Sequence, residues 1–461
     1  MRIVVATAVY YPMINGVANF SRNLAEGLAR RGHEVLVITP SQDGKNHEET
    51  VNGVKVAYLH SVQIKVYPDQ IHELDDRGVK AELKVKKEKK KAWRKKWHFP
   101  WYRHGFRVSV FPGREIKRVL DRFQPDVVHV QVSDPIGLSV VGYAKKHQIP
   151  VVTTEHNQPE VLTASLHLGF LRRPANYLLA AYFRNRQSKS DFVTMPTEKA
   201  IYDLLDGHGE LGVPIAAVSN GVDLSHFTPG WKCGQNNERD LKQSNNGKTC
   251  KESSGRPNGE FYEKYGLSRD GQYVLYVGRV DPEKKVGTVI EAFEKAVEMI
   301  KKENGNNKKV RQKLPKLLIV GDGTDRARLE KKAERMGGEV RFLGKVLPPD
   351  LYDIYKVGEV FVTASEVETQ GIVLIEAAAT GLPLVAVDKG AVSEICNDGE
   401  NGYLCQAGNV TEMANAIYNI LMDESLRERY AEKSVEIAGE HDLEKTLDKF
   451  INIYRHVMSD K

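Results

Sequence analysis

The hydrophobic pattern of the chain alternates between short apolar runs and amphipathic stretches. Residues 2–8 form a continuous apolar run, as expected of a strand that is buried on both faces of a parallel sheet. Phe20, Leu24 and Leu28 then recur at a spacing of four, which predicts an amphipathic helix that Gly32 ends. Further strands are predicted in this half at residues 34–38, 126–130, 150–154, 192–195 and 215–219, with a helix around 136–146.

A polar stretch interrupts this alternation. Residues 231–258 hold many Asn, Gly, Ser and Lys and almost no large aliphatic side chains, which indicates a loop or linker. Strands that alternate with helices predict parallel βαβ units, so we expect an α/β protein of two doubly wound, Rossmann-like domains. Ligands bind such sheets at the carboxyl ends of the strands, so the expected site is the cleft between the domains. The second half has its own predicted strands at residues 273–278, 316–320, 340–343, 360–364 and 384–387.

The composition is that of a globular protein. The 461 residues are 41% hydrophobic and 28% charged, and no stretch approaches the roughly eighteen apolar residues of a membrane helix. A single Arg2 precedes the first apolar run, and Pro12 and Gly16 follow it, which favours a buried strand over a signal peptide. We therefore expect a cytoplasmic protein with reduced cysteines. Cys233 and Cys250 flank the polar stretch and would pair only in an oxidising compartment.

The net charge of +6 is unevenly distributed. Residues 80–107 contain twelve Lys or Arg and two Glu, a local balance of +10, so the rest of the chain carries −4. Within this basic segment, Trp93 and Trp97 lie one helical turn apart around Lys95 and Lys96. Tryptophan suits a bilayer interface and the cations suit anionic headgroups, so the segment predicts peripheral binding at the inner face of the cell membrane. A solvated, charge-rich insertion is the alternative.

The most informative stretch is SEVETQGIVLIE at residues 365–376, which follows an apolar strand. Glu368 is expected in the strand-to-helix turn and Glu376 inside the helix. The N–H groups at the helix start, near residues 370–373, would form a polar cradle for an oxygen-rich ligand, and Gly371 would allow close approach to the backbone. A surface turn with two solvated glutamates is the alternative for this stretch taken alone.

A second motif, VGRVDPEK, again follows a predicted strand and carries Arg279 and Lys284. Two fixed cations suit a diphosphate, whose negative charge grows as its bond to a sugar breaks. A basic surface loop is the alternative. In the first domain, Asn15 and Gly16 form a similar turn before a helix, which is weak evidence by itself.

Together these motifs resemble the retaining glycosyltransferases of family 4, which have the GT-B fold. Glu368 and Glu376, with seven residues between them, match the two-glutamate motif of that family. Arg279 and Lys284 fall on its phosphate-binding pair. The resemblance spans nearly the whole chain, and its other motifs appear in the family's order at residues 15–16, 126–131, 220–223 and 321–323.

The resemblance implies a role for each matching residue. Glu376 would hold the ribose hydroxyls of a nucleotide, and Arg279 and Lys284 would stabilise the departing diphosphate without a tightly bound metal or cofactor. His156 matches the histidine that reaches the sugar, with a structural histidine as the alternative, while His129 stays open between the two. The remaining donor-binding residues implied are Glu368 and the backbone of Thr369, Gln370, Gly371, Ile372 and Val373 for the sugar, with Asn15, Gly16 and Gly321 in glycine turns.

The resemblance also implies a domain plan and a substrate class. Residues 1–220 would bind the acceptor, residues 221–440 would bind the nucleotide sugar, and a C-terminal helix in 441–461 would pack back on the first domain. Gln370 replaces the family's usual aromatic residue, and this variant resembles enzymes that glycosylate diacylglycerol or related lipids. We therefore predict hexose transfer from a UDP- or GDP-hexose to a membrane lipid, with a soluble or polysaccharide acceptor as the alternative.

Other classes fit the sequence less well. A nicotinamide-dependent oxidoreductase needs a Gly-x-Gly-x-x-Gly turn, but the first turn has a single glycine, Gly16. A glycoside hydrolase needs two carboxylates that face one scissile bond, which a ribose-binding Glu376 does not allow. A nucleic-acid-binding protein built on the basic segment would bind RNA in a salt-dependent way without affinity for a sugar nucleotide. We do not expect a nucleic acid as partner.

Overall fold

The computed structural model describes residues 1–11, 13, 16–63, 107–131, 134–156, 172–206, 209–229, 257–306 and 313–460. The chain divides into two compact units. Unit 1 comprises Met1–Gly221 and Glu444–Lys461, and unit 2 comprises Val222–Leu443. Each unit has its own sheet and its own hydrophobic core. Asn15, most of the basic segment and nearly all of residues 231–258 lie outside the described residues.

Unit 1 is built on a sheet of the order β10-β9-β8-β7-β1-β2-β4-β3, in which all neighbours are parallel except β3 and β4. A short antiparallel pair, β5 (Val62–Gln63) and β6 (Arg107–Val108), stands beside this sheet. The strands of the sheet are β1 (Arg2–Ala6), β2 (Glu34–Pro40), β3 (His47–Val51), β4 (Val54–Leu59), β7 (Val127–Val130), β8 (Val151–Thr154), β9 (Phe192–Met195) and β10 (Ile215–Ala217).

Two helices of unit 1 begin with a side-chain cap. Asp134 caps α3 (Pro135–Lys146) by accepting from the Gly137 N–H at 2.7 Å, and Thr197 caps α6 (Glu198–Leu205). The other helices are α1 (Gly16–Arg30), α2 (Gly113–Phe123), α5 (Arg172–Gln187) and α14 (Leu443–Ser459).

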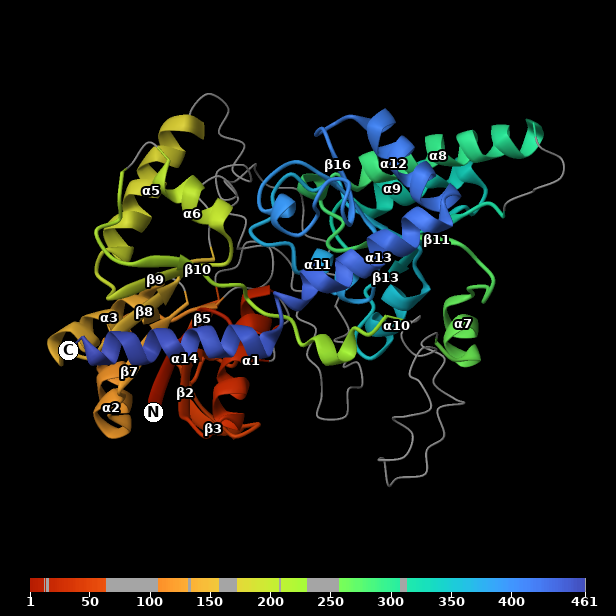
Figure 1. Ribbon diagram of the computed structural model, residues 1–461. Helices are drawn as coiled ribbons and strands as arrows, with labels where there is room; N and C mark the ends of the chain where they lie inside the picture. Colours follow the sequence, from red (N-terminus) through yellow and green to blue (C-terminus); the bar gives the residue numbers. More distant parts are fainter. Residues whose placement is uncertain are drawn as a thin grey trace, which may run out of the picture. The chain divides into compact units, whose positions relative to one another are not determined.

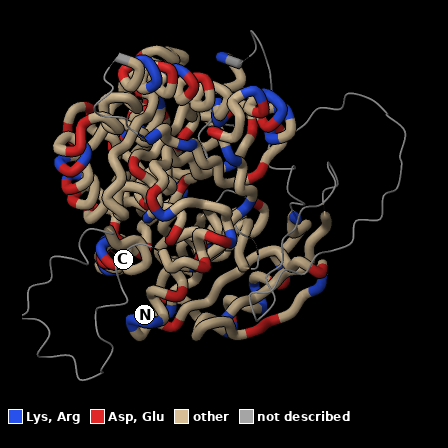
Figure 2. Tube along the Cα trace, turned by 90° about the vertical axis from the view of Figure 1, so that its right-hand side faces the viewer, with Lys and Arg blue, Asp and Glu red and all other residues tan. Residues whose placement is uncertain are grey.

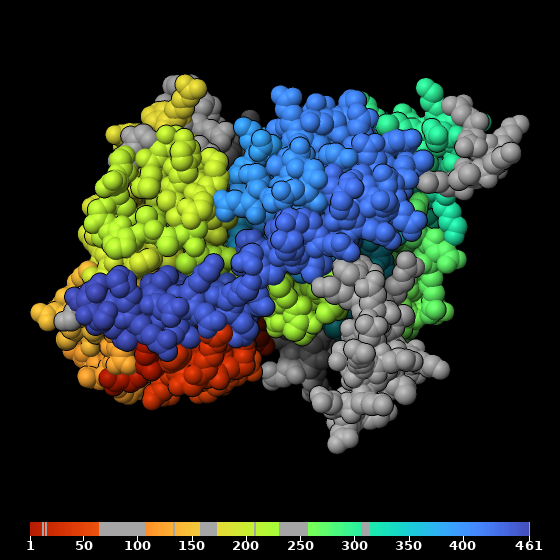
Figure 3. All heavy atoms as spheres, viewed as in Figure 1, coloured from red at the N-terminus to blue at the C-terminus, as the bar shows by residue number. Residues whose placement is uncertain are grey.

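The C-terminal helix α14 packs on unit 1 (Figure 1). Leu447, Phe450 and Tyr454 bury their side chains, and a Cβ atom at Gly27 of α1 would lie only 2.5 Å from Leu447 Cδ1. A larger residue at position 27 would therefore require the side chain of Leu447 to move. In Figure 3 the dark-blue atoms of α14 lie on the surface of unit 1, between the red N-terminal segment and the yellow-green segment that contains β9 and β10.

Unit 2 is built on a parallel sheet of the order β13-β12-β11-β14-β15-β16, with hydrophobic clusters on both faces. The strands are β11 (Tyr273–Val277), β12 (Lys316–Val320), β13 (Val340–Gly344), β14 (Val360–Val362), β15 (Leu384–Val387) and β16 (Gly402–Cys405). The helices are α7 (Gly259–Tyr265), α8 (Val286–Asn306), α9 (Arg326–Ala333), α10 (Asp350–Val357), α11 (Ile372–Ala379), α12 (Val410–Met422) and α13 (Glu424–Gly439), and short 3₁₀ turns include Leu224–His226, Pro282–Lys284, Glu334–Met336 and Val392–Glu394.

Every strand predicted from the sequence is present, with ends that differ by at most two residues. The sequence reasoning missed β3, β4, β5, β6 and β16. Strand β3 reads HEETV and is exposed along most of its length, because it is the antiparallel edge of the sheet and buries no apolar face. Its composition therefore carries no hydrophobic signal.

Candidate functional site

The strand order of unit 2 reverses at the centre of its sheet. Strand β12 lies on one side of β11 and β14 lies on the other, so the connections on either side of this point leave in opposite directions. Doubly wound sheets bind ligands in the crevice at the carboxyl ends of such strands. The two motifs singled out in the second half of the sequence follow β11 and β14, so both reach this switch point.

Lys284 and Glu368 meet at the switch point. The ammonium nitrogen of Lys284 lies 2.6 Å from Glu368 Oε1, and the two side chains are only 15% and 16% exposed. The same nitrogen also lies 3.4 Å from Ser365 Oγ and 3.5 Å from the carbonyl oxygen of Val367. All of these acceptors belong to the turn after β14, so one cation fastens the turn that carries Glu368 to the loop after β11.

Arg279 lies on the same loop but points to other carboxylates. Its guanidinium pairs with Asp281 and, at 3.1 Å, with Glu283, and its side chain is 48% exposed. Asp281 is buried and also accepts from the N–H and hydroxyl of Thr324, each at 2.9 Å. Asp281 therefore holds the glycine turn at residues 321–323 against the loop that carries both predicted cations.

That glycine turn touches the backbone of the loop after β11. A Cβ atom at Gly321 would lie 1.8 Å from the carbonyl oxygen of Gly278, and one at Gly323 would lie 2.3 Å from that of Val280. Gly321 also has a φ of 137°, which L residues rarely adopt. Both positions require glycine because two backbones cross there.

The start of α11 follows the turn that carries Glu368. Gly371 caps the helix in the left-handed conformation, with a φ of 79°. The first N–H groups of a helix have no partner inside it, so those of Ile372 and Val373 fit the predicted cradle. Gln370 is buried, and Thr369 and Gln370 each make further interactions within the structure.

Glu376 lies inside α11 and binds Tyr355 of α10. The tyrosine hydroxyl donates to Glu376 Oε2 at 2.6 Å. Burial raises the pKa of Glu376 to about 7, and the hydrogen bond from Tyr355 opposes this shift. The structure therefore joins Glu368 to Lys284 and Glu376 to Tyr355, so the two glutamates of the motif have separate partners.

The sheet of unit 1 also reverses its order, between β1 and β7. Gly16 begins α1 after β1, and Gln131 follows β7. His156, just after β8, donates from Nε2 to Gln131 Oε1 at 2.9 Å, and its ring meets Phe20 edge-on with 5.1 Å between centroids. This bond leaves Nδ1 as the acceptor of the His156 ring.

His129 is a fully buried neighbour in the same network. The Gln131 amide lies 3.4 Å from its Nε2, the Thr154 hydroxyl lies 2.7 Å from the same nitrogen, and Tyr454 of α14 lies 2.6 Å from its Nδ1. Burial lowers the pKa of His129 to about 3 and that of His156 to about 4. Both rings are therefore neutral near pH 7. His129, left open by the sequence, has a structural role because it ties α14 to the sheet.

Other predicted features fall partly outside the described residues. Trp93, Lys95, Lys96 and Trp97 lie there, as do Cys233 and Cys250. Cys396 and Cys405 are free and buried. Within the described ranges, no group of three His, Cys, Asp or Glu side chains is arranged to hold a metal ion. In the same ranges, no helix has both the length and the apolarity to cross a membrane.

The sequence reasoning missed three residues that organise these clusters. Asp281 lies between Arg279 and Lys284 in one motif, so its position was a usable signal. Tyr355 and Tyr454 lie in amphipathic helices with no motif of their own, so only packing reveals their bonds to Glu376 and His129.

Comparison with known proteins matches both units to one enzyme family. Residues 14–226 match the model described as Glycosyltransferase Family 4, and residues 258–436 match the model described as Glycosyl transferases group 1. The chain belongs to the family 4 glycosyltransferases. The family that the sequence motifs resemble is thus confirmed. The glycosyltransferase is similar to the alpha-monoglucosyldiacylglycerol synthase of Acholeplasma laidlawii, at 26% identity over 411 residues that cover 87% of this chain and 84% of that protein.

Solved structures confirm the fold of the glycosyltransferase as GT-B. Sucrose-phosphate synthase from Thermosynechococcus elongatus superposes with a TM-score of 0.67 at 17% identity and covers 100% of both chains. HepE from Anabaena, in complex with UDP and glucose, superposes with a TM-score of 0.62 at 16% identity and covers 99% of this chain and 100% of its own.

Proposed function

We propose that this glycosyltransferase moves a hexose from a UDP- or GDP-hexose to a membrane lipid such as diacylglycerol, with retention of the anomeric configuration. The observation that carries the proposal is the pairing of Lys284 with Glu368 at the switch point of unit 2. A cation and a carboxylate at this place match the two groups that a sugar diphosphate needs. One balances the phosphates and the other accepts from sugar hydroxyls.

Donor binding would exchange the partners of these charges. The ammonium group of Lys284 would turn from Glu368 to the diphosphate, which frees the carboxylate for the hexose. Arg279, half-exposed and held by two carboxylates, would supply a second cation. Charge on the leaving diphosphate is greatest in the transition state, so both cations would act mainly on turnover. Because these two fixed charges balance the diphosphate, we expect turnover to continue in EDTA.

Glu376 would bind the ribose. A carboxylate accepts two hydrogen bonds, and the bond from Tyr355 orients one oxygen and leaves the other for ribose hydroxyls. The base and hexose are proposed from similarity: HepE was solved with UDP and glucose, which makes UDP-glucose the first donor to test. Calorimetric titration with UDP-glucose, UDP-galactose and GDP-mannose will identify the donor. If none of these donors binds, the assignment of the donor site is wrong.

Retention would follow from attack on the same face of the sugar as the leaving group. The departing phosphate oxygen would take the acceptor proton, so no enzymic nucleophile is required. The proton NMR spectrum of the product made from an α-linked donor should show an α linkage. A β linkage would contradict this part of the proposal.

The lipid acceptor is supported by the alpha-monoglucosyldiacylglycerol synthase to which the chain is similar and by the composition of the basic segment. Ten net positive charges and interfacial tryptophans would hold the enzyme at the inner face of the cell membrane. The test is transfer to diacylglycerol in vesicles, compared with transfer to soluble glycosides and polysaccharides. Co-sedimentation with anionic vesicles at low and high salt, with a Trp93→Ser/Trp97→Ser variant, tests the segment itself. Transfer to soluble acceptors alone would replace the lipid assignment.

A further inference from the structure

Helix α5 of unit 1 exposes an apolar face. Tyr177 is 60% exposed and Leu178 is 68% exposed, and Tyr182 follows one turn later on the same side. The opposite side of the helix is anchored by the buried side chains of Ala180 and Phe183. One face of the helix is therefore buried against unit 1, and the outer face exposes large apolar side chains.

Cations border this apolar face on both sides. Helix α5 contains four arginines and no Asp or Glu. On the helical wheel, Arg173 and Arg184 lie beside Tyr177, and Arg186 lies beside Tyr182. Arg184 donates to the carbonyl oxygens of Gly209 and Glu210, and Arg186 lies over the ring of Tyr182 at 5.2 Å. An apolar face flanked by cations is the pattern of helices that lie at a membrane interface.

A basic groove of about 240 Å³ adjoins the Arg186 side of α5. Its apolar wall comes from β7 and α3, and its cations come from the ends of α3 and α5. Lys145 pairs with Asp191 at 3.1 Å, whereas Arg186 and Lys189 form no ion pair with any described residue. The Nε atom of Arg186 is buried without a hydrogen-bond partner. The residues that define this basic groove are Val130, Leu138, Val141, Lys145, Arg186 and Lys189.

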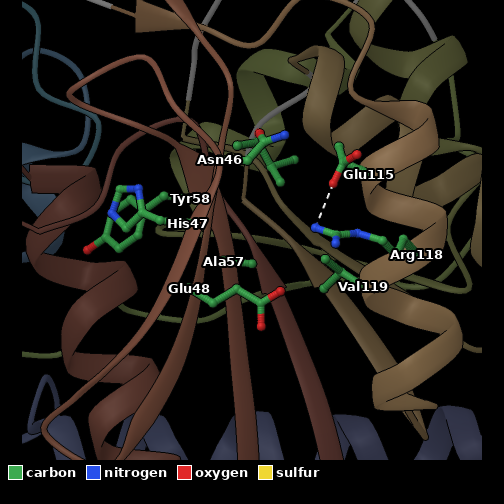
Figure 4. A pocket seen from close by; sticks show the side chains of 9 residues that line it. Asn46, His47, Glu48, Ala57, Tyr58, Glu115, Arg118 and Val119 are labelled. Carbon is green, nitrogen blue, oxygen red and sulfur yellow. Dashed lines mark ion pairs between the residues drawn. The ribbon is translucent and has the colours of Figure 1, made fainter.

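Another pocket of unit 1 differs from the basic groove in its balance of charges. This second pocket lies between β3, β4 and α2 (Figure 4). Its charges are already balanced, because Arg118 pairs with Glu115 at 2.8 Å and Glu48 pairs with Arg122 of the same helix. Lys, Arg, Asp and Glu are likewise interspersed over the described parts of the chain in Figure 2. The basic groove keeps a surplus of positive charge beside an exposed apolar face.

We propose that the outer face of α5 and the basic groove together dock unit 1 on a bilayer that contains anionic phospholipid. The apolar side chains would enter the interface, and the cations of the groove would receive a lipid phosphate. This inference extends the proposed transfer to a membrane lipid and rests on that proposed function. The docking surface is separate in sequence from the basic segment, since it uses only residues 130–189.

The first test compares an exposed leucine of the proposed docking surface with an exposed leucine of unit 2. Leu178→Ser on α5 and Leu314→Ser in unit 2, where Leu314 is 38% exposed, remove the same side chain. Co-sedimentation of the full chain uses vesicles of phosphatidylcholine alone or with phosphatidylglycerol. We expect Leu178→Ser to weaken binding to the anionic vesicles about tenfold, with Leu314→Ser unchanged. The result should repeat in the Trp93→Ser/Trp97→Ser background. Equal binding of both leucine variants would overturn the proposal.

The second test addresses the basic groove. A Cβ atom added at Gly142 of α3 would meet no atom within 4 Å, so Gly142→Leu adds a side chain at the groove, and Gly113→Leu on α2, where an added Cβ is equally free, is the matched control. Lys189→Glu reverses a groove charge, and Lys302→Glu on α8 is its control. We expect both groove variants, and neither control, to lose the preference for phosphatidylglycerol by about fivefold at unchanged melting temperature.

Two results would count against a lipid-docking role for this surface. Cations at helix ends also stabilise helices, and that role alone predicts a lower melting temperature with unchanged lipid preference, which would overturn the proposal. Tight binding of inorganic phosphate without vesicles would overturn it as well. Vesicle binding is measured without donor or turnover, so the docking surface can fail while transfer to detergent-dispersed diacylglycerol persists. Conversely, the docking surface can hold even where no lipid is glycosylated.

Discussion

The two switch points of this glycosyltransferase differ in charge: one holds an ion pair and the other holds neutral polar groups. In unit 2, Lys284 and Glu368 form a charged pair that is shielded from solvent. In unit 1, His129 and His156 are kept neutral by burial and are joined through Gln131. A buried charge is costly unless it is paired, so we expect the pair in unit 2 to open only when a charged ligand replaces one partner. The neutral network presents polar groups without a charge.

The largest expected effect comes from the cations of unit 2. Lys284→Ala should lower kcat by about 10²–10³-fold, because a fixed charge that stabilises the leaving group is lost. Arg279→Ala should lower kcat less, since that side chain is half-exposed. Steady-state kinetics on each variant and on the double variant measure this. Full activity of the double variant would remove the basis for the donor assignment, and Lys295→Ala on the exposed face of α8 serves as the control.

A smaller effect is expected at the ribose position. Glu376→Ala should weaken donor binding by about 1–3 kcal/mol, because buried hydroxyls lose their acceptor. Since the pKa of Glu376 is raised to about 7, binding that needs the carboxylate should strengthen as the pH rises through 7. The hydrogen bond from Tyr355 lowers this pKa, so Tyr355→Phe should move the midpoint upward. Calorimetric titration between about pH 6 and 8.5 (a range chosen to bracket the midpoint) tests both points, and a midpoint unmoved by Tyr355→Phe would contradict this coupling.

The buried histidines of unit 1 should make the protein less stable as the pH falls below their ordinary pKa. Their pKa values lie below the ordinary value near 6.5, so the unfolded chain binds protons first as the pH falls. The stability that the neutral rings contribute is present above about pH 6.5 and is lost between there and about pH 4. Melting temperatures should fall by several degrees across this window, and His129→Gln should flatten the decline. An equally steep decline in that variant would show that other groups cause it.

The smallest effect should come from the link between α14 and the sheet. Tyr454→Phe removes the hydroxyl that His129 contacts at 2.6 Å and should cost about 1 kcal/mol of the free energy of unfolding. Because the change keeps the ring, donor binding in unit 2 should be unchanged. Chemical denaturation followed by tryptophan fluorescence, together with donor titration, separates the two readouts. A loss of donor affinity at equal stability would argue against independent roles for the two clusters.

The sequence by itself determined the family, the positions of the charged motifs and most of the succession of strands and helices along the chain. These features are local, because the period of the hydrophobic pattern and the spacing within a turn are set by neighbouring residues. For the same reason Gly321, Glu368 and Glu376 could be picked out as candidate site residues before the fold was known. The edge strand β3 was beyond such reasoning, since it buries no apolar face.

Only the tertiary structure decided which of these residues meet. Lys284 and Glu368 are 84 positions apart and come together because β14 lies beside β11. His129 and Tyr454 are 325 positions apart and meet because the chain returns to unit 1 in its last helix. Strand order and helix docking depend on how whole surfaces pack, and no local pattern encodes them. The same packing lowered the pKa values of the histidines and raised that of Glu376, because burial changes the solvation of each group.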